Sequence, residues 1–274
     1  MVGQALRNHC EACGDVVFPY DHSALDITNG TAVWSAVQRC EPNAIINCAA
    51  WTDVDGCESD SERAFAVNAS GPENLATASE KAKASFVTIS TDYVFDGTKD
   101  GFYTEEDEPN PQSVYGRSKL EGEKRSRETN TGSVIVRTGF IFGPGGKNFL
   151  STVIERSRRG EQIKAIVDAY GTPTYSIDLA RKLRELAQLK HSGIFHITNS
   201  GEGVSYEEFA RQAILSAGLN VPNVVGIRME SLNRPAPRPR NSRLRSLNSE
   251  KLGLEPLRDW RESLVDFATN TQTP

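Results

Sequence analysis

A tyrosine and a lysine stand four residues apart in the stretch NPQSVYGRSKLEGEK, at Tyr115 and Lys119. Asn110 and Pro111 can begin a helix there, so this spacing places both side chains on one helix face. A tyrosine can give a proton to a carbonyl oxygen, and a nearby ammonium group lowers the phenol pKa by favouring the phenolate. Alone, such a pair is more often a solvated contact than a catalytic one.

A second stretch, ISTDYVFDG, supplies a hydroxyl group in a suitable place. Ser90, Thr91 and Asp92 end the apolar run SFVTIS, which has the composition of a buried strand. Ligands of open α/β sheets bind outside the carboxyl ends of the strands. There, Thr91 can hold a ketone oxygen on which charge develops, and the hydride must come from a cofactor because no side chain donates one.

The elements that position these residues alternate along the chain. Strands are expected at 15–20, 44–49, 85–90, 133–138, 163–168 and 194–199, and helices at 31–40, at 61–84 and from near residues 111, 148, 176 and 205. This alternation predicts an α/β fold, a Rossmann-type doubly wound parallel sheet with a smaller C-terminal substrate-binding lobe. The dinucleotide-binding domain is expected over 1–145 and most of the substrate lobe over 146–274, with 163–168 and 194–199 returning to the sheet.

Composition disfavours several other classes of protein. The net charge of −5 argues against a nucleic-acid surface. No apolar stretch reaches the roughly 18 residues that a membrane helix needs, and no secretory signal pattern opens the chain. Five cysteines, an odd number, suggest reduced thiols in the cytoplasm. Cys10 and Cys13 lack a second ligand pair at zinc spacing, so no metal site is predicted.

Together these motifs resemble the extended short-chain dehydrogenase/reductases and, within them, the dTDP-4-dehydrorhamnose reductase family. The resemblance runs through nearly the whole chain, in SALDIT, INCAAWTDVDGCES, VNASGPENLA, ISTDYVFDG, YTEEDEPNPQSVYGRSKLEGE, GPGGKNF, YGTPTY and RPRNSRL. STDYVFDG and RPRNSRL are its most specific parts. The resemblance implies reduction, by NADPH or NADH, of the 4-keto group of a nucleotide-linked 6-deoxy sugar, from dTDP-4-dehydro-L-rhamnose to dTDP-L-rhamnose.

The resemblance also assigns roles to individual residues. It makes Thr91, Tyr115 and Lys119 the catalytic residues, with Tyr115 as proton donor and Lys119 also on the cofactor ribose. Besides Tyr115 and Lys119, the residues expected at the cofactor are Gly3, Asp21, His22, Asp26, Ile27, Ala49, Ala50 and Thr52. Those expected at the sugar nucleotide are Val54, Tyr93, Phe140, Asn148, Arg238 and Asn241. Asp21 favours NADH whereas His22 could tolerate the phosphate of NADPH, so the choice of cofactor stays open.

Three features depart from the family pattern. Phe140 stands where members commonly have tryptophan, and Ala169 where they have glutamine; either change could alter sugar specificity. The opening MVGQALR matches only the end of the family's glycine-rich loop, with Gly3 on its third glycine. The first strand and the first two glycines are therefore expected to be missing from this chain. Family members can bind Mg²⁺ at a subunit contact, but no motif here places that ion.

The expected partners are a nucleotide-sugar substrate and, in a homodimer, a second copy of the chain, without nucleic acid or membrane. Two other functions stay open. The regulatory subunit of methionine adenosyltransferase shares the fold and many of these motifs, and sugar-nucleotide epimerases and dehydratases share the fold as well. The intact Thr91, Tyr115 and Lys119 set favours an enzyme over a binding subunit. The proline-rich stretch 233–244 is expected to be a loop that lies across the surface or over a site, 105–108 a solvated loop, and His196 a packed core residue.

Overall fold

The centre of the molecule is a parallel sheet with the strand order β1-β2-β3-β8. Its strands are β1 (Ala44–Asn47), β2 (Ser85–Thr91), β3 (Val134–Thr138) and β8 (Gly193–His196). The computed structural model describes residues 1–146, 148–189, 191–221 and 223–270. Every residue of β3 is buried, as the β-branched run VIVRT requires of a strand covered on both faces.

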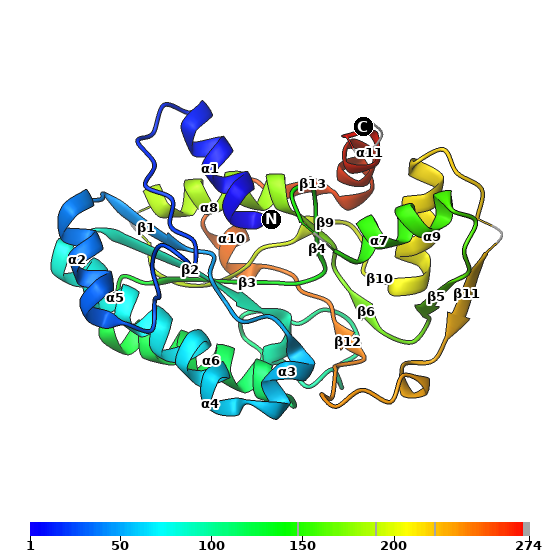
Figure 1. Cartoon of the computed structure of the whole chain (residues 1–274), viewed down its shortest axis with the longest axis horizontal. Coiled ribbons are helices and arrows are strands. Elements are labelled where there is room, and N and C mark those ends of the chain that lie inside the picture. Colours follow the sequence, from blue (N-terminus) through cyan, green and yellow to red (C-terminus); the bar gives the residue numbers. More distant parts are fainter. Residues whose placement is uncertain (147, 190, 222, 271–274) are drawn as a thin grey trace.

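Helices cover both faces of this sheet (Figure 1). On one face lie α2 (Gly30–Cys40), α5 (Gly71–Ala82) and α6 (Val114–Thr129), and on the other lie α1 (Val2–Ala12) and α8 (Ser176–Gln188). Neighbouring residues of β2 serve opposite faces, since Phe86 joins the core under α2 and α5 whereas Val87 joins the core under α1 and α8. The predicted doubly wound α/β fold is confirmed.

Residues 15–20 do not form the strand that their composition predicts. No described strand pairs with them, and within the described residues β1 has a neighbouring strand on one side only. Val16 is 82% exposed and Phe18 is 51% exposed. A β-branched, apolar run becomes a strand only where a neighbouring backbone completes its hydrogen bonds, and this segment lies against none.

A second lobe has its own small core. β5 (Ile163–Ile166) pairs with β11 (Val224–Ile227), and both pack against α7 (Phe149–Arg158) and α9 (Tyr206–Ser216). The expectation that 163–168 returns to the main sheet is therefore wrong, whereas β8 places residues 194–196 in that sheet. Helix α11 (Trp260–Asn270) packs on α9. The boundary near residue 145 stays a prediction.

Short elements connect the two lobes. The short strands are β4 (Ile141–Phe142), β6 (Tyr170–Gly171), β7 (Thr174–Tyr175), β9 (Asn199–Ser200), β10 (Val204–Ser205), β12 (Asn241–Ser242) and β13 (Leu257–Asp259), and the short helices are α3 (Val54–Ser59), α4 (Ser61–Phe65) and α10 (Leu247–Lys251). β12 pairs with β6 and so fixes the end of the proline-rich loop 233–244 to the second lobe. Among the described helices none is both long and apolar enough to cross a membrane.

Two helical predictions needed correction in detail. The side chain of Ser113, not Asn110, caps α6, because Asn110 donates instead to the Asp96 carboxylate. The long helix expected over 61–84 is interrupted by a π-helical turn (Ala66–Ser70) between α4 and α5. Within that turn Asn68 accepts a hydrogen bond from the backbone N–H of Trp51 and donates one back to its carbonyl. The π turn therefore fixes the loop that follows β1.

Candidate active site

Thr91, Tyr115 and Lys119 come together at the carboxyl end of β2. Thr91 is the last residue of β2, whereas Tyr115 and Lys119 lie in the first turns of α6, and all three side chains are buried. The approach of α6 depends on Gly116, because a Cβ atom there would lie 2.3 Å from the carbonyl oxygen of Tyr93. The predicted hydroxyl, phenol and ammonium groups thus share one site.

Burial dominates the electrostatics of the two ionisable groups. It lowers the pKa of Lys119 to about 8, opposed by the nearby Glu123 carboxylate, and the Lys119 ammonium donates to the carbonyl oxygen of Ile89 at 2.7 Å. Burial raises the pKa of Tyr115, and a hydrogen bond with Thr91 opposes that rise. The structure therefore holds Tyr115 as a protonated phenol, ready to donate, rather than as the partly ionised phenol that the sequence predicts.

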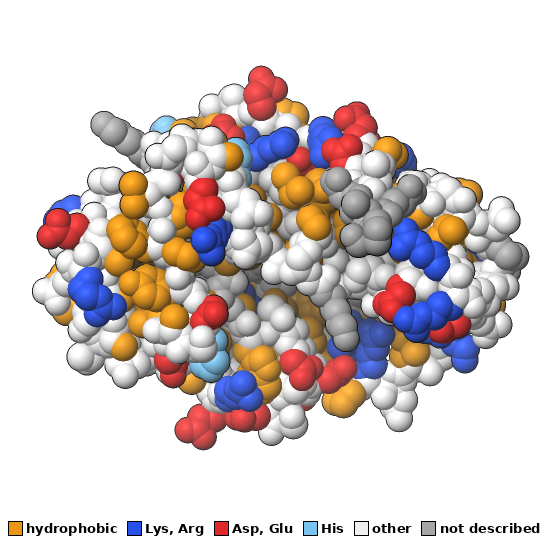
Figure 2. Space-filling view, turned by 45° about the horizontal axis from the view of Figure 1, so that its top comes forward, with side chains coloured by type: hydrophobic (Ala, Val, Ile, Leu, Met, Phe, Trp, Pro, Cys, Tyr) orange, Lys and Arg blue, Asp and Glu red, His pale blue; other side chains and the backbone are white. Residues whose placement is uncertain are grey.

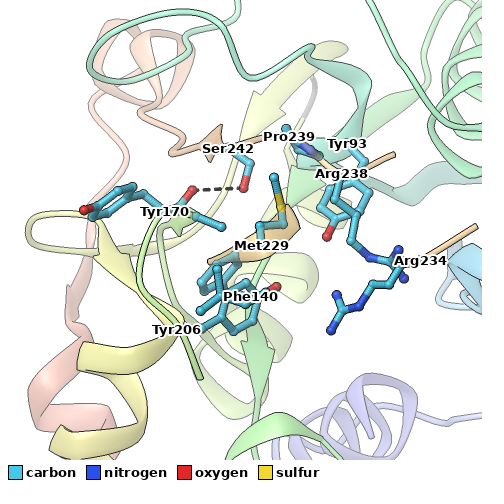
Figure 3. Close-up of a pocket in the computed structure, with 11 residues that line it drawn as sticks. Tyr93, Phe140, Tyr170, Tyr206, Met229, Arg234, Arg238, Pro239 and Ser242 are labelled. Atoms are coloured by element: carbon cyan, nitrogen blue, oxygen red, sulfur yellow. Dashed lines mark hydrogen bonds between the residues drawn. The ribbon is translucent and has the colours of Figure 1, made fainter. Parts of the chain in front are cut away.

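A small cavity is lined by Tyr93, the second residue after Thr91 (Figure 3). The side chains that line it come from both lobes and from the proline-rich loop: Tyr93, Phe140, Ile166, Ala169, Tyr170, Tyr206, Met229, Arg234, Arg238, Pro239 and Ser242. Phe140 stacks on Tyr206 with ring centroids 4.3 Å apart. Tyr93 meets the ring of Tyr115 edge-to-face at 6.0 Å, which links the cavity wall to the trio. An aromatic wall with arginines at one side suits a sugar that carries an anionic group.

The proline-rich loop is fastened across the cavity by an ion pair. The two terminal nitrogens of the Arg238 guanidinium, Nη1 and Nη2, donate to the Asp55 carboxylate at 2.9 Å, and the backbone N–H of Ala236 donates to the same group. Asp55 lies in α3, so this contact ties the loop to the part of the chain that carries the main sheet. Arg234 lines the same cavity with its side chain exposed. Residues 233–240 form the predicted loop, and three of them line this cavity.

Other residues expected at the substrate have structural partners instead. The side chain of Asn148 caps α7 and donates to the carbonyl oxygen of Gly143. Asn241 donates to the carbonyls of Lys99 and Gly101 and accepts from Arg243. Val54 begins α3. The structure brings Tyr93, Phe140 and Arg238 to the cavity but places Asn148, Asn241 and Val54 outside its described lining.

The residues expected at the cofactor lie in two groups. Gly3 lies in the first turn of α1 beside Cys48, with its Cβ position 3.7 Å from the Cys48 Cβ, and Ala49, Ala50 and Thr52 follow on the loop after β1. Ala49 and Thr52 are exposed. These small side chains leave room for a planar group along the carboxyl edge of the sheet, where doubly wound folds bind dinucleotides. This first group fits a nicotinamide cofactor.

The second group lies on the segment before α2. Asp21 accepts hydrogen bonds from Ser23 and Ala24, which lower its pKa, and the Asp26 carboxylate accepts two from Thr28. Ile27 packs on Gly71 of α5, and His22 is exposed. Both carboxylates thus stabilise turns in this segment. Among the described residues no group of three or more His, Cys, Asp or Glu side chains could hold a metal ion, so Mg²⁺ gains no support.

Comparison with known proteins identifies the family. The model described as the RmlD substrate binding domain matches residues 1–273. The chain belongs to the RmlD family. A dTDP-4-dehydrorhamnose reductase of Streptomyces griseus is 38% identical over 273 residues, which is 97% of this chain and 89% of the relative.

Solved structures of RmlD-family reductases have the same fold. A dTDP-4-dehydrorhamnose reductase of Clostridium acetobutylicum is 39% identical with a TM-score of 0.95, covering 99% of this chain and 96% of its own. The reductase of Bacillus anthracis, solved in complex with NADP, is 34% identical with a TM-score of 0.94 and covers 98% of this chain and 95% of its own. The family resemblance inferred from the motifs is confirmed.

Sequence reasoning missed three residues that build this site. Asn68 fixes the loop after β1, Asp55 holds Arg238, and Tyr206 supports Phe140 from α9. Asn68 and Asp55 lie inside the motifs VNASGPENLA and INCAAWTDVDGCES, which mark them only as part of a pattern. Tyr206 carries no sequence signal, because its role depends on how α9 packs in the second lobe.

Proposed function

We propose that this chain reduces the 4-keto group of a nucleotide-linked 6-deoxy sugar, dTDP-4-dehydro-L-rhamnose, with NADPH or NADH. The observation that carries the proposal is the meeting of Thr91, Tyr115 and Lys119 beside a cavity lined from both lobes. Membership of the RmlD family supports the substrate class. The NADP complex of the Bacillus anthracis relative supports NADPH.

The residues divide the chemistry of carbonyl reduction between them. A reduced nicotinamide, when bound, supplies the hydride to the sugar carbon. The phenol of Tyr115 donates its proton to the sugar oxygen, since burial keeps this group protonated until the oxygen becomes basic. Thr91 is close enough to Tyr115 to hydrogen-bond with the same oxygen. The Lys119 ammonium then favours the phenolate that remains, because opposite charges attract strongly in a buried site.

The cavity wall explains how a nucleotide sugar would be held. Phe140 and Tyr206 present an apolar face to the sugar ring, and Phe140 in place of tryptophan removes an indole donor. Arg234 and Arg238 at the loop suit the diphosphate. Of these two, Arg238 already has the Asp55 carboxylate as a partner, whereas Arg234 forms no ion pair with the residues that the structure describes. A homodimer and a cytoplasmic location stay predictions.

The test is oxidation of NADPH and NADH by the purified full chain, followed by absorbance with dTDP-4-dehydro-L-rhamnose as substrate. One mole of cofactor consumed for each mole of ketosugar supports the proposal. Bound NAD that is not consumed would instead indicate an epimerase or dehydratase. Capture of a methionine adenosyltransferase catalytic subunit without any turnover would indicate the binding subunit.

A matched pair of lysine variants adds a control on the same helix. Lys119→Met should weaken cofactor binding and lower kcat, because it removes a buried ammonium. Lys124→Met changes an exposed lysine of α6 and should leave both unchanged. Equal behaviour of the two variants would contradict the role given to Lys119.

A further inference from the structure

The Thr91 hydroxyl group lies among three polar groups but has only one hydrogen to donate. Its Oγ1 accepts a hydrogen bond from the backbone N–H of Tyr93 at 3.1 Å and donates to Oδ1 of Asp92 at 3.1 Å. The Tyr115 phenol lies nearby, since the Thr91 hydroxyl opposes the rise of its pKa. A hydroxyl group has one hydrogen and two acceptor lone pairs. While that hydrogen is committed to Asp92, Thr91 can only accept from Tyr115 and offers no hydrogen to a reacting oxygen.

The surroundings of Asp92 disfavour a charged carboxylate. Asp92 is only 3% exposed, and its Oδ2 is buried with no hydrogen-bond partner among the described residues. The backbone at Gly139 packs directly on it, since a Cβ atom there would lie 2.3 Å from the carboxyl group. An ionised carboxylate so placed leaves lone pairs unsatisfied, which is costly in a buried site. A protonated carboxyl has fewer lone pairs to satisfy and one hydrogen to give.

Within the described part of the chain, no cation lowers the pKa of Asp92 by its charge. The groups that face Asp92 are Tyr115 from α6, Tyr93 from the turn after β2, Tyr206 from α9 and the Ser242 hydroxyl from β12. Burial raises the pKa of all three tyrosines, so they are neutral near pH 7. Burial also raises the pKa of Asp92, to about 6, with the hydroxyls of Ser242 and Thr91 opposing that rise.

We propose that Asp92 is a positioning residue for the reduction, which in its protonated form donates to Oγ1 of Thr91 and so turns the single Thr91 hydrogen toward the reacting oxygen. Asp92 keeps its proton throughout. The only proton that changes its bond is the one that leaves the Tyr115 oxygen for the sugar oxygen. Ionisation of Asp92 draws the Thr91 hydrogen back to the carboxylate and slows the reduction of the ketosugar. This inference rests on the proposed reductase function.

The test compares three variants with the wild-type chain. Asp92→Asn supplies a fixed N–H donor of similar shape, Asp92→Ala supplies no partner, and Asp100→Asn removes a carboxylate on the exposed surface as a control. The rate of hydride transfer in a single turnover is measured at saturating cofactor and ketosugar from pH 5.5 to 8.0. Titration of Lys119 changes the rate of the wild type and of the variants alike. The ratio of the variant rate to the wild-type rate therefore reports the effect of Asp92 alone.

We expect the ratio of Asp92→Asn to wild type to rise at least about fivefold across this range, because the wild-type rate falls by up to about tenfold for each pH unit above the pKa of Asp92. Asp92→Ala should lose kcat with little change in KM, and Asp100→Asn should follow wild type. A ratio that does not change with pH, or an Asp92→Asn variant as slow as Asp92→Ala, would overturn the proposal.

A second measurement does not depend on activity. The infrared difference between wild type and Asp92→Asn, taken without ligands, should contain a protonated-carboxyl stretch at pH 5.5 that fades as the pH rises. Its absence at pH 5.5 would also overturn the proposal. If the wild-type chain reduces no ketosugar, the proposed function fails, and this spectrum still reports on the Asp92 carboxyl group.

Discussion

Removing the charge of Glu123 should destabilise the fold far more than removing an exposed charge on the same helix. Glu123 of α6 accepts hydrogen bonds from the Arg137 guanidinium of β3, among them Nη2 to Oε2 at 2.7 Å and Nε to Oε1 at 3.0 Å. Ser90 donates to the same carboxylate. The side chains of Arg137 and Glu123 are only 2% and 4% exposed. Almost no water therefore screens this pair (Figure 2 shows, by contrast, the charged side chains that lie on the surface).

The expected cost follows from that burial. Glu123→Gln keeps the shape but leaves the Arg137 charge buried without its partner, which costs about 3–5 kcal/mol in the free energy of unfolding. Glu121→Gln breaks the half-exposed pair with Arg125 and should cost less than about 1 kcal/mol. A double variant, Glu123→Leu with Arg137→Met, should recover most of the loss, because an apolar pair of similar volume avoids the desolvation cost.

Urea unfolding measures these differences as shifts of the midpoint at constant slope. The loss in Glu123→Gln should also persist at high salt, because salt screens buried charges weakly. If Glu123→Gln cost no more than Glu121→Gln, the reasoning about burial would be refuted. If the double variant were as unstable as the single one, packing rather than charge would explain the loss.

Two further perturbations test the packing around the site. Gly122→Ala places a Cβ atom 2.1 Å from the carbonyl oxygen of Asn68. The variant should therefore lose about 1–3 kcal/mol or more of the free energy of unfolding, and the loop after β1 should loosen. An unchanged melting temperature would contradict this close approach. Burial lowers the pKa of His196 to about 4, below the roughly 6.5 of an unfolded chain. The contribution of the neutral imidazole to the free energy of unfolding is therefore complete above about pH 6.5. It is lost as the pH falls toward 4, at up to about 1.4 kcal/mol per pH unit. His196→Asn should flatten the dependence of the unfolding free energy on pH between 6.5 and 4, and a steeper dependence in that variant would count against the assignment.

Periodicity and residue type were sufficient to predict most of the main sheet. The apolar runs at 44–49, 85–90 and 133–138 became β1, β2 and β3, because a parallel strand covered on both faces needs continuous apolar character. The same signal failed at 15–20, where no neighbouring backbone is present among the described residues. It also assigned 163–168 to the main sheet, whereas this strand pairs with β11, because the partner of a strand depends on the topology of the whole chain.

The site was predictable where one helix or one strand end defines it. Tyr115, Lys119 and Thr91 follow from spacing and from the strand end, and the structure places them together. The acidic stretch 105–108 was expected to be solvated, but Glu105 accepts hydrogen bonds from His196, Ser246 and Leu247. No local pattern could show this, since its partners lie about 90 residues or more away along the chain.

The chemistry of Asp92 and Arg238 likewise depends on distant segments. Asp92 is flanked by Gly139 and Ser242, and Arg238 is held by Asp55. Their residue types alone suggested an acid at a strand end and a phosphate ligand. Their packing favours a protonated Asp92, and it shows that Arg238 also holds the proline-rich loop to α3.

The most direct test of the central claim is the effect of Tyr115→Phe on reduction of dTDP-4-dehydro-L-rhamnose. The variant removes one oxygen from a buried ring that packs against Tyr93, so the fold and cofactor affinity should change little. We predict that kcat falls by about 10²–10⁴-fold, the range for loss of a general acid. A variant that folds, binds cofactor and still reduces the ketosugar at a rate close to wild type would contradict the account.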